Sequence, residues 1–229
     1  MSKDQIRQLI QNNATQEGLT GTGIDGVRLF RATQAIPCVP AVYEPSVIAI
    51  VSGAKEAVLD GHRYIYDDSR YMCCPMSMPV KAGTPTASAE SPLYGAIISL
   101  DKRMMTELSM EMENTGNVIP EVKGGLRAQG IRLAAWDDAF ADSLLRLLQL
   151  GGNPADTAIL GEARLRELYY AILKGEAGRF ARQAFGAGNA IARSIAHVSS
   201  HLDAPISIDD MASRAGMSRA LFRTAAAFL

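Results

Sequence analysis

The chain has 229 residues, of which 48% are hydrophobic and 21% charged, and its formal net charge is −1. This composition excludes an intrinsically disordered chain and a polycation that binds nucleic acid through charge alone. No apolar run approaches the roughly 18 residues that a membrane-spanning helix needs, and the polar N-terminal segment MSKDQIRQLIQNN is not a signal peptide. The cysteines Cys38, Cys73 and Cys74 are too sparse for a disulfide scaffold, so we expect reduced thiols and a cytoplasmic protein.

The first half of the chain predicts a β-rich unit. Short apolar or alternating runs recur about every 8–12 residues, with proline and serine clusters between them, which is typical of a sandwich or barrel. The pair Asp60-Gly61 lies between two such runs and is a strong β-hairpin signal. Strands are expected at 46–53, 55–59, 62–67, 70–74, 78–83 and 93–100, with an additional edge strand at 26–33.

The second half predicts α-helices. Asp101 is placed to cap the first of them, and a glycine-containing loop follows it at 114–125. Apolar residues then recur at helical spacing, and Gly175 marks a helix end. The expected helices span about 101–113, 136–150, 160–175 and 187–202. A domain boundary is expected near 186–189.

The C-terminal segment 206–229 predicts a helix, a three-residue turn and a second helix. Ser207 is placed as the N-cap of the first helix, and Gly216 ends it. Ser218 is placed to cap the second helix. This helix–turn–helix shape can place one helix in a DNA major groove. The alternative is an ordinary helical hairpin.

The sequence offers few residues for catalysis. A metal-dependent enzyme of the cupin type needs several imidazoles and a carboxylate around one metal, and the β-rich half contains a single histidine, His62. His197 and His201 are four residues apart on a predicted helix, with no third ligand nearby in sequence. No catalytic Ser–His–Asp set or phosphate-binding loop stands out. We expect no catalytic residue, no metal site, no cofactor and no enzymatic activity.

Several segments of the chain resemble AraC-type transcriptional regulators. The motifs VYEPS (42–46), SGAKEAVLDGHRYIYDDSRYM (52–72), SMPV (77–80) and SPLYGAIISLD (91–101) resemble the N-terminal effector domain of one branch of that family. The motif LRELYYAILKGEAG (165–178) is similar to the same branch. The segment IARSIAHVSSHLDAPISIDDMASRAGMSRALFR (191–223) resembles the start of the family's DNA-binding region. The likeness runs in order from about residue 25 to residue 223.

The resemblance implies an α+β fold with two domains. Residues 1–186 would form an effector-sensing and dimerisation domain, with a cupin-like β-barrel over about 25–100 and linker helices over about 101–186. Residues 187–229 would form a partial DNA-binding domain. A small-molecule effector, a homodimer and DNA are the partners that this family implies.

The resemblance also implies the DNA-contacting residues. The first recognition helix would begin at Ser218, and Arg219 and Arg223 would contact phosphate or guanine, which arginine can bind in bidentate fashion. The family has two helix–turn–helix motifs, and this chain contains only the first before ending in TAAAFL (224–229). We therefore expect a truncated unit whose DNA binding is weak or lost.

The effector is not identified by the sequence. Strand alternation places Tyr64 and Tyr66 on one face, and Cys73 and Met76 nearby, as side chains that could line the barrel. Plain core packing is the alternative for each of them. The adjacent Cys73 and Cys74 could also sense redox state or a soft metal, although an apolar strand favours core packing.

Three functions follow from these observations. The first is an AraC-type regulator in which the effector shifts the population of linker arrangements and so repositions the DNA-binding units. The second is a protein that binds an effector and dimerises without reading DNA. The third is a cupin-type enzyme, against which the scarcity of histidine argues.

Overall fold

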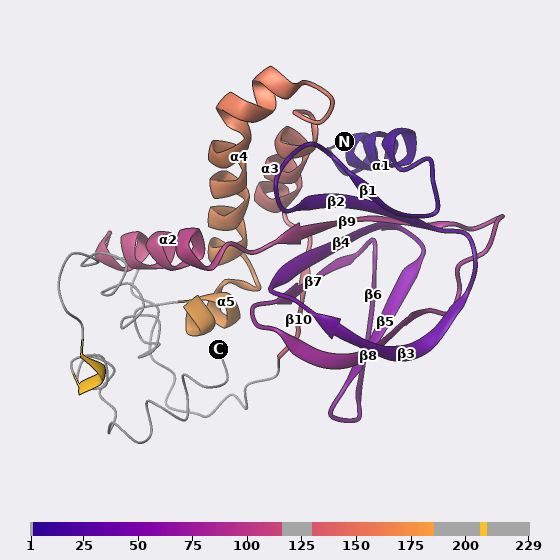
Figure 1. The fold of residues 1–229 in the computed structure, drawn as a ribbon, viewed down its shortest axis with the longest axis horizontal. Coiled ribbons are helices and arrows are strands. Elements are labelled where there is room, and N and C mark those ends of the chain that lie inside the picture. The colour runs from indigo at the N-terminus through magenta and orange to yellow at the C-terminus, as the bar shows by residue number, and fades with distance from the viewer. Residues whose placement is uncertain (1, 116–129, 186–206, 210–229) are drawn as a thin grey trace.

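The computed structural model of this chain describes residues 2–115, 130–185 and 207–209. It has an α+β fold in which a sheet-rich N-terminal region is followed by helices (Figure 1). Two antiparallel sheets face each other in a cupin-like arrangement, which we call the barrel, although the described strands form two separate sheets and no closed cylinder. The expected fold class is confirmed.

The larger sheet has six strands in the order β1-β2-β9-β4-β7-β10. These strands are β1 (Gly18–Gly21), β2 (Val27–Ala32), β4 (Ser46–Ser52), β7 (Arg70–Cys74), β9 (Leu93–Ser99) and β10 (Arg132–Ala135). The smaller sheet has four strands in the order β3-β8-β5-β6. These are β3 (Ile36–Tyr43), β5 (Ala54–Leu59), β6 (His62–Asp67) and β8 (Met78–Thr84).

The predicted hairpin forms where the sequence places it. β5 and β6 pair from Ala54↔Asp67 to Leu59↔His62, which leaves only Asp60 and Gly61 in the turn. Both have positive φ, 49° and 79°, as the two central residues of a type I′ turn require. The turn chemistry therefore fixes the register of this hairpin.

Four strands differ from the prediction. β1 was not predicted, and because it pairs with the outer side of β2, β2 is not an edge strand. β3 contains Pro37 and Pro40 and pairs only with β8, so it lies at a sheet edge, where proline's missing N–H is tolerated. β10 comes from the segment after the first linker helix and pairs with β7.

Five helices are described in full: α1 (Ser2–Asn13), α2 (Lys102–Asn114), α3 (Asp138–Leu148), α4 (Pro154–Lys174) and α5 (Gly178–Phe185). The N-cap of α3 is Asp137, whose carboxylate accepts a 2.7 Å hydrogen bond from the Phe140 N–H. α4 begins earlier than predicted because Asn153 caps it and Pro154 suits its first turn. Gly175 is its C-cap, as expected.

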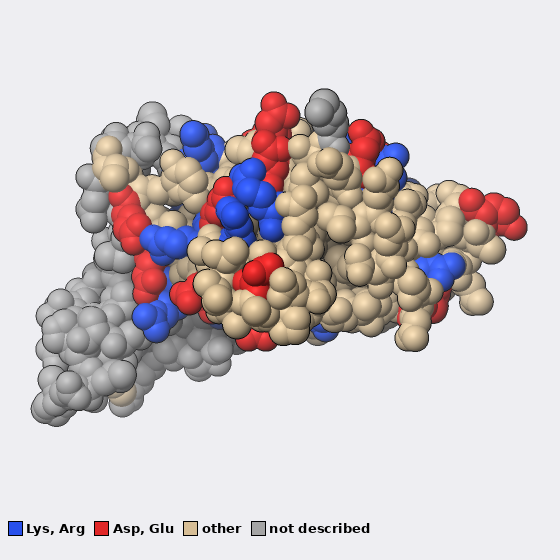
Figure 2. Space-filling model, turned by 90° about the horizontal axis from the view of Figure 1, so that it is seen from above, with Lys and Arg blue, Asp and Glu red and all other residues tan. Residues whose placement is uncertain are grey.

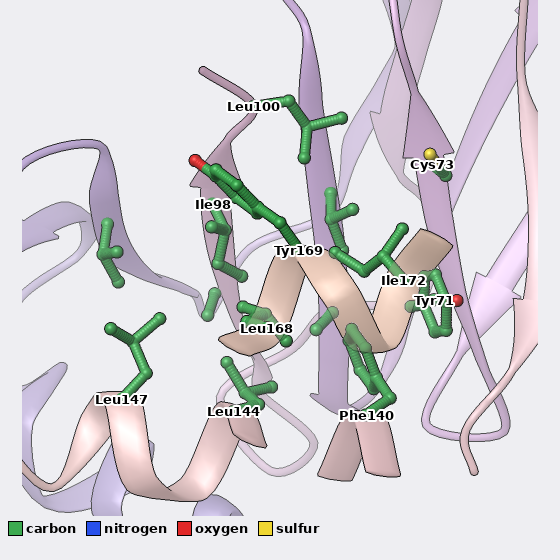
Figure 3. Close-up of a cluster of buried hydrophobic side chains, with 14 of the residues drawn as sticks. Tyr71, Cys73, Ile98, Leu100, Phe140, Leu144, Leu147, Leu168, Tyr169 and Ile172 are labelled. Carbon is green, nitrogen blue, oxygen red and sulfur yellow. The ribbon is translucent and has the colours of Figure 1, made fainter. Parts of the chain in front are cut away.

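Alternation in the larger sheet divides the interior into two cores. One face packs against the helices and forms the helix-side core (Figure 3). Its sheet residues include Val47, Ala49, Val51, Tyr71, Cys73, Ala96 and Ile98, and its helix residues include Ile6, Ile10, Phe140, Leu144, Leu147, Leu168, Tyr169 and Ile172. The Tyr71 and Phe140 rings stack with centroids 4.1 Å apart. This contact fixes α3 against β7.

Ion pairs connect the helices at the surface. Arg146 of α3 donates a 2.6 Å hydrogen bond to Glu167 of α4, and Arg166 of α4 donates one of the same length to Glu111 of α2. On the face seen in Figure 2, basic and acidic side chains lie beside one another over the helical part, and the barrel side carries fewer charges. That face has no large patch of a single sign.

Part of the predicted C-terminal unit lies outside the described residues. Of that unit only 207–209 are described, and Ile208 and Asp209 are helical directly after Ser207. Residues 116–125 of the loop predicted at 114–125, the boundary near 186–189 and the helix at 187–202 fall in the undescribed ranges. No helix in the described part of the chain is long and apolar enough to cross a membrane.

Candidate functional site

The space between the two sheets is filled by a second core, which we call the barrel core. Both sheets contribute to it, and most of its side chains are apolar. Its buried members are Phe30, Ala32, Tyr43, Ile48, Ile50, Ala57, Tyr66, Met72, Cys74, Met78, Val80, Ala87, Leu93 and Ile131. The polar groups that face this core are the natural candidates for contact with a ligand.

Two tyrosine hydroxyls meet inside the barrel. The Oη atoms of Tyr43 and Tyr66 are 2.9 Å apart, and the residues are only 9% and 1% exposed. Burial raises the pKa of both hydroxyls, so they stay protonated. In such a pair one hydroxyl donates to the other, and the second proton has no acceptor among the hydrogen bonds of the described residues.

A lysine faces the same interior. Lys55 lies opposite Tyr66 in the register of β5 and β6, and paired residues on adjacent strands point to the same face. Its side chain is half-buried, and its Nζ is 5.5 Å from the centroid of the Phe30 ring. Burial lowers the pKa of Lys55. No ion pair within the described ranges involves this amine.

A glycine positions the ring beneath that lysine. Phe30 of β2 is paired with Gly95 of β9. A Cβ at Gly95 would lie 2.4 Å from the Phe30 Cζ and 2.4 Å from the Ala49 carbonyl oxygen. Only glycine leaves room for the Phe30 ring to lie over β9, where it supports the Lys55 ammonium through a cation–π contact.

The residues proposed from the sequence are distributed differently. Tyr66 is in the barrel core, and the half-buried Tyr64 packs against it. The proposal for Cys73 is wrong, because alternation in β7 turns its side chain into the helix-side core (Figure 3). Met76 lies after β7 with 44% of its surface exposed, so it does not line the interior either. Cys74 is the β7 cysteine that faces the barrel.

The adjacent cysteines are poorly placed for joint chemistry. Cys73 and Cys74 are both fully buried, one in each core, so their thiols lie on opposite faces of the sheet. Burial raises the pKa of Cys73 to about 12 and that of Cys74 to about 11. Redox chemistry and metal binding both need a thiolate, and the environment here disfavours it.

Sequence reasoning missed Lys55, Phe30 and Tyr43. A signal was present for the first, since Lys55 shares strand parity with Ala57 and Leu59, which face the barrel core. A lysine on the apolar face of an alternating strand is unusual and points to an interior role. No such alternation signal marks Tyr43 in the sequence, because its strand contains two prolines, which are typical of loops.

Metal ligands do not assemble in the described part of the chain. There, no group of three or more His, Cys, Asp and Glu side chains could hold a metal ion. His62 is exposed at the hairpin. His197 and His201, and the predicted DNA-contacting residues Ser218, Arg219 and Arg223, lie outside the described residues.

A groove of about 1170 Å³ separates the barrel from α4. It is lined by the loop around Gly23, the start of α2 and one face of α4 that includes Gly161 and Tyr169. At its floor Tyr169 Oη donates a 2.5 Å hydrogen bond to the Ser99 carbonyl oxygen. The groove thus lies at the junction of barrel and helices, outside the barrel core.

Comparison with known proteins identifies the family of this fold. A family model described as the N-terminus of AraC-type transcriptional regulators matches residues 23–180. No curated protein sequence matches the chain.

Solved structures of similar fold belong to transcriptional regulators. ToxT from Vibrio cholerae O395 bound to (E)-4-(8-methylnaphthalen-1-yl)but-3-enoic acid is 10% identical, with a TM-score of 0.52 over 86% of this chain and 73% of that one. An apo ToxT variant from Vibrio cholerae strain SCE256 is 10% identical, with a TM-score of 0.49 over 92% of this chain and 76% of that one. The AraC-like transcriptional activator CuxR is 9% identical, with a TM-score of 0.45 over 88% of this chain and 70% of that one. At such identities the first of these supports the fold alone.

Proposed function

The chain belongs to the family of AraC-type transcriptional regulators, and on that premise we propose that it senses a small-molecule effector in its barrel and contacts DNA through its C-terminal segment. The observation that carries this proposal is the extent of the family match. It spans residues 23–180, which include nearly all of the barrel and helices α2, α3 and α4. Such a regulator would work in the cytoplasm and would not be an enzyme.

The barrel core is the proposed effector site. Lys55 and the Tyr43–Tyr66 hydroxyl pair supply polar groups within an otherwise apolar interior. Ligand sites in proteins combine apolar walls with a few placed polar groups in this way. An effector bound there would favour one arrangement of the barrel relative to the helices, and the population shift would reposition the DNA-contacting segment.

We propose that α4 also serves homodimerisation. Its exposed side carries large apolar residues that nothing in the described chain covers, with Ile159 78% and Tyr170 41% exposed. Leu160 is 39% exposed beside them. An apolar helix face of this kind is suited to a second copy of the chain. Light scattering at matched concentrations should give the mass of a dimer for the wild type and the mass of a single chain for Ile159→Asp. Equal masses for the two proteins would contradict dimerisation through this face.

DNA contact is proposed for the recognition helix that begins at Ser218. Arg219 and Arg223 are four residues apart in the sequence, so in a helix they would lie one turn apart, and arginine binds both phosphate and the guanine edge. With few basic residues in the segment, few phosphates can be neutralised, so the affinity for DNA is expected to be weak. The alternative function is a protein that binds an effector and dimerises without reading DNA.

Fluorescence anisotropy separates these two functions. The full chain is titrated into labelled promoter duplex from its own locus and into a random duplex, at low and moderate salt. Binding that prefers the promoter at moderate salt, and that is lost in the Arg219→Ala/Arg223→Ala double variant, supports the regulator. Arg28→Ala on β2, an exposed arginine far from the C-terminal segment in sequence, is the matched control. Equal binding to both duplexes, or none, supports the alternative.

A further inference from the structure

Building on the proposed effector sensing, we infer that the effector is an amphipathic organic acid whose carboxylate pairs with Lys55 while its apolar part lies against the barrel core. The first support is the position of the lysine. Lys55 lies on the inner face of β5, opposite the buried Tyr66, with its Nζ 5.5 Å from the Phe30 ring centroid.

The second support is the missing counter-charge. On the outer face of the same sheet, the Arg63 Nε donates a 2.7 Å hydrogen bond to the Glu56 carboxylate, so that cation is neutralised by the protein. On the inner face, Lys55 has an aromatic ring and no carboxylate among the described ion pairs. A partly desolvated cation is stabilised most by an anion, so a ligand carboxylate would supply what the barrel lacks.

The third support is the hydroxyl pair. Tyr43 and Tyr66 share one hydrogen bond of 2.9 Å, which leaves one O–H proton for an outside acceptor. One cation and one hydroxyl suit the two oxygens of a carboxylate. A sugar would provide no negative charge for Lys55, and the apolar walls formed by Phe30, Ile50 and Leu93 would face its hydroxyls unfavourably.

An incoming acid can reach the Lys55 ammonium without moving a rigid part of the barrel. The lysine stem is flexible, and its ammonium can turn from the Phe30 ring toward an incoming acid. Pairing would bring the neutralised amine and the ligand's apolar part into the barrel together. The affinity should therefore depend on the charge of the ligand and on the charge of Lys55 at once.

The experiment compares acids with their uncharged analogues on the full chain. Medium-chain alkanoic and arylalkanoic acids, their methyl esters, and a neutral set of sugars and sterols are screened by thermal shift, and hits are titrated by calorimetry. The variants are Lys55→Met, which keeps the stem, and Lys55→Arg, which keeps the charge. Lys81→Met is the matched control, because Lys81 is exposed on the outer face of the same sheet.

We expect at least one acid to raise the melting temperature and to bind at least tenfold more tightly than its ester. Lys55→Met should remove that tenfold preference, whereas Lys55→Arg and Lys81→Met should keep it. Neutral compounds that bind as tightly as the acids, with Lys55→Met unchanged, would overturn the acid inference and leave effector sensing standing. If no compound of either set binds, both proposals fail.

Discussion

The hydroxyl of Tyr169 donates a 2.5 Å hydrogen bond to the Ser99 carbonyl oxygen. The same hydroxyl accepts a 3.2 Å hydrogen bond from the backbone N–H of Asp101. These two contacts attach α4 to the end of β9 and to the start of α2. They lie at the point where the barrel meets the helices. A shift of β9 would therefore move the hydrogen-bond partner of Tyr169 and, with it, α4.

Tyr169→Phe should therefore lower the free energy of unfolding by about 1–2 kcal/mol, because two part-buried backbone groups lose their partner. Urea titration followed by circular dichroism measures this loss. Tyr170→Phe is the matched control, since that neighbouring side chain is 41% exposed and faces away from the junction. Equal stability of the two variants would show that the Tyr169 hydrogen bonds contribute nothing.

The Tyr43–Tyr66 pair should behave non-additively. Either single change to phenylalanine leaves one buried hydroxyl without its 2.9 Å partner and should cost about 1–2 kcal/mol. The double change removes both polar groups and should cost less than the sum of the singles. A double-mutant cycle from four urea titrations gives the coupling, and strict additivity would contradict the pairing.

Gly95→Ala should destabilise the barrel by about 1–3 kcal/mol, since the new Cβ would overlap the Phe30 ring and the Ala49 carbonyl. Gly161→Ala is an instructive contrast. In α4 the added Cβ would meet only the Thr157 Cγ2, at 3.9 Å, so alanine should stabilise the chain by about 0.5–1 kcal/mol through its helix propensity. Thermal melts of both variants test the opposite signs.

Glu167 should make stability depend on pH. Its pKa is held below the usual value of 4.5, chiefly by the hydrogen bond from Arg146 and further by Arg164. The folded pKa thus lies below the unfolded one, so the stabilisation is present above the unfolded pKa and is lost as the pH falls through the folded pKa. Because Glu167 is 34% exposed, we expect at most about 1 kcal/mol.

The measurement for Glu167 is the stability difference between the wild type and Glu167→Gln in urea at neutral and acidic pH. The difference should be present at neutral pH and should shrink toward zero in acid. A difference that does not change with pH would assign the effect to packing and not to the charge.

Much of the barrel could be predicted because strand alternation is a local signal. The hairpin at Asp60-Gly61 and the strands around it needed only turn chemistry and the apolar pattern. β10 could not be predicted in this way, because it is four residues long and is stabilised by pairing with β7, far away in sequence. β3 was missed because its prolines are typical of loops, and only its edge position explains them.

The candidate site was predicted in part for a similar reason. Parity within β6 placed Tyr64 and Tyr66 on one face, and that reasoning needs no tertiary information. Which face of β7 points into the barrel depends on how the sheet packs against the helices, so Cys73 was assigned to the wrong side. The Lys55–Phe30 contact joins two sheets and is visible only in three dimensions.

The pairing of β10 with β7 has a consequence for exchanging parts between regulators. Ile131, next to β10, is buried in the barrel core, and Ala134 of β10 is buried in the helix-side core. A chimera spliced directly after β9 would graft a barrel that lacks its outermost strand β10 and the part of the helical cover that comes from α3 and α4. A transplanted barrel of this chain would therefore have to keep the residues at least through α5, whose Phe185 is buried in the helix-side core.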